Sequence, residues 1–121
     1  MSIFKRVVSH NTELSGTKIY ATGEPGPGGA YHDYEILTLD NELLCLIQFQ
    51  HGPLKDPNSI KGIQMEDLLA ICIDRLECFQ NGNFPCKENE IALQHCKEAL
   101  KSLNERTKNR VERGVEGKEV R

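Results

Sequence analysis

Three arginines, Arg106, Arg110 and Arg113, are spaced by four and three positions. On a helix this spacing puts all three on one face, where they repel one another unless an anion lies between them. A guanidinium group grips phosphate oxygens at two points, and each such charge-assisted hydrogen bond contributes about 1.5–3 kcal/mol. The spacing therefore predicts a phosphate site. The alternative is that these cations complement the dipole of a helix C-terminus or pair with nearby glutamates.

Phe79 and Asn89 could recognise the base of a nucleotide. Phe79 ends one expected helix and Asn89 lies at the start of the next, so an antiparallel hairpin puts both near its turn. An aromatic ring stacks on a base, and an amide reads the polar edges of a base. The pattern also fits a Phe79 that closes the hairpin core and an Asn89 that caps the second helix.

Two glycine-rich segments are candidates for anion binding. Arg113, Gly114 and Lys118 belong to a run that could form a backbone concavity for a second anion, although glycines after a helix also simply terminate it. Residues 23–29 lack the Lys-Ser/Thr ending of a phosphate loop, and a strand-like segment follows them instead of a helix. We expect residues 23–29 to form a connection or a lid.

Neither catalysis nor metal binding is indicated by the cysteines and histidines. The five cysteines are separated by 27, 6, 8 and 10 residues, which matches no zinc-site spacing, so we expect reduced, buried thiols. His95 and Cys96 are adjacent, but neighbours on a helix diverge by about 100°. The sequence contains no nucleophile elbow and no histidine–cysteine or histidine–serine signature. We expect no catalytic residue, no cofactor and no metal ligand.

Charge is spread unevenly along the chain, whose formal net charge is -3. Residues 1–86 carry 6 basic and 11 acidic side chains, whereas residues 87–121 carry 9 basic and 7 acidic ones. Local charge decides what a site attracts, so an anionic ligand is compatible with the acidic total. The apolar runs are far shorter than the roughly 20 residues that cross a bilayer, and residues 1–5 show no signal-peptide core, so we expect a cytosolic protein.

The first half of the chain has the pattern of strands. Residues 34–39 and 42–50 are rich in strand-forming residues, and Asp40 and Asn41 between them suit a tight turn. Residues 17–22 and 4–9 are expected to be further strands of an antiparallel sheet. In the strand at 42–50, apolar residues alternate on both faces at its start, which predicts burial of that end on both sides.

From Met65 onward the apolar period changes to about 3.6, which predicts helices. Asn81 and Gly82 are expected to end the first helix. A short link through Pro85 follows, so we expect the second helix to pack antiparallel to the first. The expected packing seam consists of Met65, Leu69, Cys72, Leu76 and Phe79 on the first helix and Ala92, Cys96, Ala99, Leu103, Arg106 and Arg110 on the second.

We predict one α+β domain spanning residues 1–121, in which a small N-terminal antiparallel sheet precedes a C-terminal antiparallel helical hairpin. The sheet takes residues 1–52 and a connector takes residues 53–64. The hairpin takes residues 65–113, and residues 114–121 form a tail.

Residues 62–118 resemble the helical hairpin shared by two phage families, the Thoeris anti-defence sponges and the anti-CBASS cyclic-oligonucleotide sponges. The N-terminal strands, with Ser15-Gly16-Thr17-Lys18-Ile19 and the glycine-proline loop, resemble the Thoeris branch. The landmarks of the hairpin are Leu68-Leu69-Ala70-Ile71-Cys72-Ile73-Asp74-Arg75-Leu76, Phe79-Gln80-Asn81-Gly82, Cys86-Lys87-Glu88-Asn89, Ala92-Leu93, Ala99-Leu100, Glu105-Arg106-Thr107, Arg110 and Arg113-Gly114-Val115-Glu116-Gly117.

The resemblance implies a sponge that sequesters cyclic ADP-ribose isomers made by a bacterial TIR-domain protein, without cleaving them, and so blocks the effector. It implies that Phe79 stacks on a base, that Asn89 makes polar contacts, and that Arg106 and Arg110 bind the pyrophosphate. It further implies homodimers or trimers of dimers with sites built across protomers, acting in the host cytoplasm with no DNA, RNA or membrane partner.

Some relatives bind cyclic oligonucleotides at a second site, which the resemblance places here at Arg113 and Gly114. Lys118 stands where those relatives have threonine, which puts this second site in question. Three rivals remain: a sponge for cyclic di- or trinucleotides of CBASS signalling, an enzyme that degrades nucleotide signals, and a protein–protein adaptor that uses the hairpin.

Overall fold

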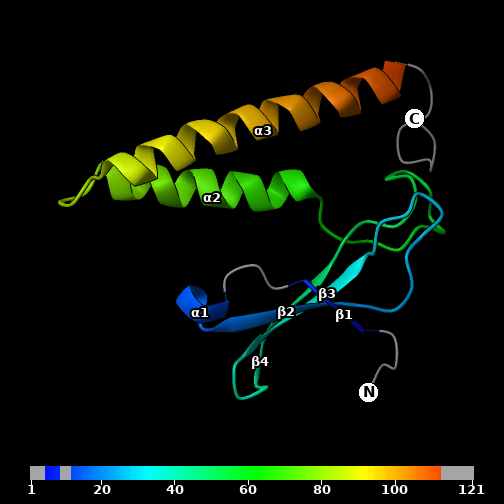
Figure 1. The fold of residues 1–121 in the computed structure, drawn as a ribbon. Helices are drawn as coiled ribbons and strands as arrows, with labels where there is room; N and C mark the ends of the chain where they lie inside the picture. Colours follow the sequence, from blue (N-terminus) through cyan, green and yellow to red (C-terminus); the bar gives the residue numbers. More distant parts are fainter. Residues whose placement is uncertain (1–4, 9–11, 113–121) are drawn as a thin grey trace. The chain divides into compact units, whose positions relative to one another are not determined.

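The computed structural model describes residues 5–8 and 12–112, which divide into two compact units (Figure 1). One unit runs up to Ile63 and contains the strands, and the other begins at Gln64 and contains the long helices. The predicted α+β class, with a sheet followed by a helical hairpin, is confirmed. That the two units form a single domain stays a prediction.

The first unit is a four-stranded antiparallel sheet in the order β1-β2-β3-β4, so each strand pairs with its neighbour in sequence. The strands are β1 (Lys5–Val7), β2 (Thr17–Thr22), β3 (Asp33–Thr38) and β4 (Leu43–Gln48). A four-residue helix, α1 (Thr12–Ser15), precedes β2. Asn41 has a φ of 70°, a left-handed conformation that asparagine tolerates, and so turns the chain between β3 and β4 as predicted.

The prediction that the start of β4 is buried on both faces is wrong. Leu43, Leu44 and Leu46 are all more than half exposed, and Leu46 reaches 67%. The reason is that β4 is an edge strand of its sheet, and among the residues of this unit whose burial is described only Ala21 is buried. Alternating apolar residues indicate which faces a strand could bury, but burial requires a second layer.

The connector between the units is held by the side chain of Gln50. Its Oε1 accepts a hydrogen bond from the backbone of Gly62 at 3.1 Å, and its Nε2 donates to Ser59 Oγ at 3.2 Å. His51 and Ile60 form a backbone bridge, and the His51 ring stacks on His32 with centroids 4.0 Å apart. Residues 53–62 are therefore an ordered turn that returns the chain to the sheet before the helices begin.

The second unit is a hairpin of α2 (Met65–Gln80) and α3 (Lys87–Glu112), which pack together. At the start of α2 the Asp67 carboxylate accepts a hydrogen bond from the backbone of Gln64 at 2.9 Å. Its negative charge suits the positive end of the helix dipole. At the other end, the backbone N–H of Gly82 donates to the carbonyl of Phe79 at 3.2 Å, so the helix stops at the predicted asparagine and glycine.

The packing seam of the hairpin differs from the predicted one. On α2 the half-buried residues of the seam are Glu66, Leu69, Ile73, Leu76 and Gln80, with Leu68 half-buried beside them. On α3 the seam consists of the buried Leu93 and the half-buried Asn89, Cys96, Leu100, Leu103, Thr107 and Arg110.

Five members of the expected seam lie in the observed one, and the others are exposed. The exposed members are Met65, Cys72, Phe79, Ala92, Ala99 and Arg106. The helices have rotated from the expected contact because the apolar arc of α2 is wide enough for two overlapping stripes, and Ile73 faces α3 in place of Cys72.

The five cysteines are free, as expected, but they are not buried. Cys45, Cys72, Cys78 and Cys86 are exposed, and Cys96 is half-buried in the hairpin seam. Thiols are small enough for any exposed position, so composition alone does not place them in a core.

Candidate functional site

The link between α2 and α3 is fixed by one side chain. The amide of Gln80 donates through Nε2 to the backbone carbonyl of Cys86 and accepts through Oε1 from the backbone N–H of Cys86, both at 3.0 Å. Such a two-point contact holds both helix ends in one geometry and satisfies backbone groups that the link would leave unpaired. Phe79 and Asn89 flank this clamp, so the hairpin tip positions both.

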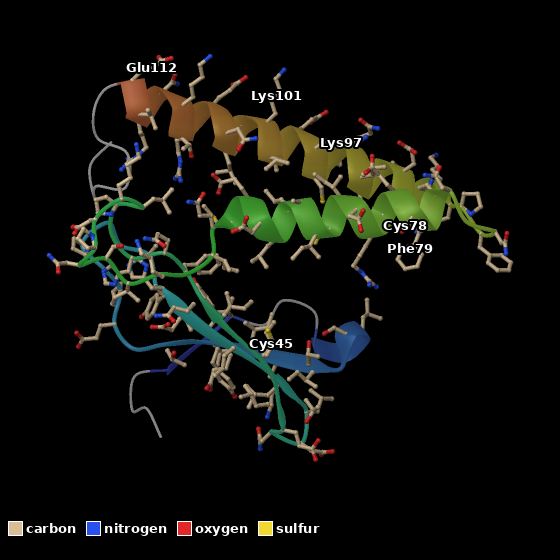
Figure 2. All side chains as sticks on the ribbon, turned by 180° about the vertical axis from the view of Figure 1, so that it is seen from behind. Cys45, Cys78, Phe79, Lys97, Lys101 and Glu112 are labelled. Atoms are coloured by element: carbon tan, nitrogen blue, oxygen red, sulfur yellow. The ribbon has the colours of Figure 1, made fainter. Side chains whose placement is uncertain are left out.

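Phe79 lies in the last turn of α2 with 51% of its surface exposed (Figure 2). The guanidinium carbon of Arg75, one turn earlier, lies 5.5 Å from the centroid of its ring. Phe79 therefore does not close the hairpin core, since it presents an exposed aromatic surface with a cation beside it. An electron-poor base can stack on such a ring, and the neighbouring guanidinium adds attraction for an anionic ligand.

Asn89 is the third residue of α3 and is half-buried. Its backbone N–H lies 3.4 Å from the sulfur of Cys86, so Cys86, and not Asn89, occupies the capping position of α3. The side-chain amide of Asn89 has no hydrogen-bond partner among the residues that the structure describes. The amide is thus available to a ligand, and the interpretation of Asn89 as a helix cap is wrong.

Two further residues of the tip were missed from the sequence. Phe84, in the link, is 88% exposed, the highest value of any large apolar side chain described. Arg75 is notable only through its contact with Phe79. Phe84 belongs to the short link through Pro85, where no helical period distinguishes an exposed aromatic residue from a packed one. The i to i+4 spacing of Arg75 and Phe79 is the signal in the sequence for their contact.

Arg106 and Arg110 lie towards the other end of α3. Arg106 is exposed and Arg110 is half-buried. Between them, Thr107 Oγ1 donates to Glu66 Oε2 at 3.2 Å, which ties this part of α3 to the start of α2. The two arginines are thus carried by a helix segment that is anchored on its inner side. Arg113, Gly114 and Lys118, predicted for a second site, lie outside the described residues.

Phe79 and Arg106 point to the same side of the hairpin. At about 100° per residue, Phe79 lies about 100° from the centre of the α2 seam, and Arg106 about 90° from the centre of the α3 seam. The two displacements have the same sense, and because the helices are antiparallel both lead to the same broad face of the hairpin. The opposite face carries the ion pair between Glu77 and Lys97, whose charged atoms are 3.3 Å apart. We call the side with Phe79 and Arg106 the arginine face; it also carries Met65, Cys72, Ala92 and Ala99.

The four predicted contact residues form two separate groups on this hairpin. Asn89 and Arg106 are both on α3 and are separated by 17 positions, which corresponds to about 25 Å along the helix axis. Phe79 adjoins the tip with Asn89, whereas Arg110 lies one turn beyond Arg106. One nucleotide-sized ligand cannot reach both groups of a single protomer, although each group offers the expected chemistry.

Within residues 5–8 and 12–112, no three histidine, cysteine, aspartate or glutamate side chains come together as metal ligands would. None of the helices described is both long enough and apolar enough to cross a membrane.

Comparison with known proteins identifies the hairpin. Residues 41–108 match the sequence model of a family described as Acb2/Tad1, hairpin domain. The chain is also 46% identical over 74 residues to a protein of Bacillus phage SBSphiJ7 named Thoeris anti-defense 1. That alignment covers 61% of this chain and 51% of the phage protein, so the chain spans about half the length of this curated relative. The family match extends over more than half of the chain and includes Phe79, Asn89, Arg106 and Arg110, and this chain therefore belongs to the Acb2/Tad1 hairpin domain family.

Proposed function

We propose that this chain is a Thoeris anti-defence protein that binds cyclic ADP-ribose isomers in the cytoplasm of a bacterial host and holds them intact, so that the effector is not activated. The name of the phage relative supports the anti-defence role. The exposed aromatic ring, free amide and arginines of the hairpin support a ligand that has both a base and a pyrophosphate.

The observation that carries the proposal is the distribution of these groups along the hairpin, with Phe79 and Arg106 on the arginine face. Base-binding groups lie at one end of the hairpin and phosphate-binding groups about 25 Å away at the other. Two hairpins that associate antiparallel through this face bring the tip of one chain to the arginines of its partner. A symmetric dimer then holds two equivalent sites, each with Phe79 and Asn89 from one protomer and Arg106 and Arg110 from the other.

Association is supported by the poor burial of the isolated hairpin. Across α2 and α3, Leu93 is the single buried residue. Met65 and Phe79 remain 45% and 51% exposed and, with Cys72, form one exposed stripe along α2; exposed apolar surface of this kind is typical of interaction sites. A dimer, or a hexamer built as a trimer of dimers, would cover that surface and enclose the ligand from two sides.

The binding energy required is compatible with these groups. Capture at nanomolar strength needs about 12 kcal/mol. Each charge-assisted hydrogen bond from Arg106 or Arg110 contributes about 1.5–3 kcal/mol, and stacking on Phe79 contributes about 1–3 kcal/mol. The remainder comes from enclosure of the ligand between protomers, where exclusion of water strengthens each polar contact.

A capture-and-release assay tests the proposal. The protein is incubated with a cyclic ADP-ribose isomer and separated from free ligand by filtration, then heated, and the supernatant is analysed by mass spectrometry. We expect depletion of free ligand and release of the unaltered isomer. A chemically changed product would identify an enzyme, and no depletion of any cyclic ADP-ribose isomer would exclude the proposed sponge.

Arg106→Ala should reduce capture in this assay, since it is expected to weaken binding at least roughly tenfold. Lys55→Ala is the matched control, because it removes one positive charge from an exposed position outside the hairpin. If both variants capture ligand as the unchanged protein does, the arginine face is not the site. A second site for cyclic oligonucleotides at Arg113, Gly114 and Lys118 stays a prediction, and the same assay with cyclic di- and trinucleotides tests it.

A further inference from the structure

The face of the hairpin opposite the arginine face carries a groove of about 480 Å³. Its apolar lining includes Ile73 of α2 and Leu100 of α3, both half-buried. Its polar lining comes from one acidic residue of α3, Glu105, and from residues spaced by four, three and four positions, namely Lys97, Lys101, Asn104 and Lys108. Figure 2 labels Lys97 and Lys101 along α3. The volume lies within the range of small-molecule sites, about 300–1,000 Å³.

The polar groups of this lysine groove are largely unengaged. Lys97 forms an ion pair with Glu77 at 3.3 Å. The side chains of Lys101, Asn104 and Lys108 form neither a hydrogen bond nor an ion pair with any residue that the structure describes. Three ammonium groups on one side of a helix repel one another, and an anion placed among them removes that repulsion.

We propose that the lysine groove is a second binding site, for a phosphate-bearing nucleotide. The apolar surface of Ile73 and Leu100 suits the face of a base, and the amide of Asn104 can pair with donors and acceptors on its edge. Lys101 and Lys108 are about 10 Å apart along the helix axis, and their flexible stems allow both ammonium groups to reach one phosphate chain. This inference does not depend on the ligand proposed for the arginine face.

An acidic helix of a partner protein fits the groove less well than a compact ligand. Glu98, Glu105 and Glu112 recur every seven positions on α3, beside the lysines, and Glu105 itself lines the groove. A partner helix lying along α3 would meet this column of carboxylates and be repelled by it. A nucleotide that reaches from Lys101 to Lys108 covers about 10 Å of α3 and passes only Glu105, whereas a partner helix would meet all three carboxylates.

Titration of the full-length protein with ADP, followed by amide chemical shifts and by calorimetry, tests the proposal. The variant Lys101→Gln/Lys108→Gln should bind ADP at least tenfold more weakly than the unchanged protein. The matched control, Lys55→Gln/Lys87→Gln, removes the same charge outside the groove and should bind ADP normally. Adenosine, which lacks phosphate, should bind at least tenfold more weakly than ADP, and salt should weaken ADP binding.

The arginine variant Arg106→Ala/Arg110→Ala separates this site from the one proposed above. It should lose cyclic ADP-ribose but retain ADP, with shift changes centred on Lys101, Asn104 and Lys108. Loss of ADP binding in the arginine variant, with normal binding in the lysine variant, would overturn the second site. So would the absence of ADP binding, and binding of a 20-residue poly-glutamate peptide instead would assign the groove to acidic proteins.

Discussion

Complementation between two defective variants offers the most direct test of a site shared between protomers. In the tip variant, Phe79→Ala/Asn89→Ala, the base-binding group is lost. In the arm variant, Arg106→Ala/Arg110→Ala, the phosphate-binding group is lost. Because the two groups lie about 25 Å apart on one hairpin, a shared site takes one group from each chain. Each variant alone should therefore bind no ligand, since every site of its homodimer lacks one group.

Mixing the two variants should restore a defined fraction of sites. Random pairing of equal amounts makes about half of the dimers mixed, and a mixed dimer has one site with both groups and one site with neither. About a quarter of the wild-type number of sites should return, each with wild-type affinity. Calorimetric titration of the co-expressed variants with a cyclic ADP-ribose isomer measures both quantities, because stoichiometry and affinity are fitted separately.

A quadruple variant that lacks both groups provides the control. The quadruple variant is mixed with an equal amount of wild-type protein. If sites are shared, about a quarter of all sites should still bind ligand, because both sites of every mixed dimer are then defective. About half should remain if each chain forms its own site. Absence of recovery in the first mixture, with half of the sites retained in the second, would refute the shared site.

Three further predictions concern single side chains. Arg106→Ala and Arg110→Ala should each weaken ligand binding at least roughly tenfold, as measured by calorimetry. Arg106→Lys and Arg110→Lys should also bind the ligand more weakly, because lysine lacks the two-point grip on phosphate. If the arginines only complement the helix dipole, their loss would cost about 0.3–1 kcal/mol of stability and leave binding unchanged. Leu93→Ala should lower the free energy of unfolding, measured by urea denaturation, by about 2–4 kcal/mol. Ile91 is 47% exposed, so Ile91→Ala should lower it less, and equal losses would show that Leu93 is not a core residue. Gln80→Ala removes two hydrogen bonds and should cost about 1–3 kcal/mol in melting experiments, and an unchanged melting temperature would contradict its role as a clamp.

Strand and helix positions were largely predictable because local signals marked them. Asn41 suits the left-handed turn that it forms, and Gly82 lies where α2 ends. The short helix α1 was missed because four residues are too few to show a helical period. Exposure was not predictable: the leucines of β4 have the pattern of a buried strand, but burial depends on a second layer that the local sequence does not specify.

The seam of the hairpin shows why periodicity identified the helices but not their contact. On α2, the sets 65, 69, 72, 76, 79 and 66, 69, 73, 76, 80 both have helical spacing and share Leu69 and Leu76. Hydropathy favours the first set, which has Met65 and Phe79 where the second has Glu66 and Gln80. The structure uses the second, because Glu66 bonds to Thr107 and Gln80 clamps the link, so both polar residues gain partners inside the hairpin.

This choice leaves the more apolar stripe of α2 on the arginine face, with consequences for binding. Met65, Cys72 and Phe79 are exposed there although their pattern is that of a core, and Arg106 lies on the same side of α3. In a dimer that covers this stripe, burial of apolar surface and assembly of the ligand site are one event. A ligand that binds only the dimer must then shift the monomer–dimer equilibrium by mass action, and its apparent affinity must fall when the protein is diluted below its own dissociation constant. If the proposed function holds, capture therefore requires a protein concentration above the dissociation constant of the dimer, which is the condition under which a sponge depletes a scarce signal.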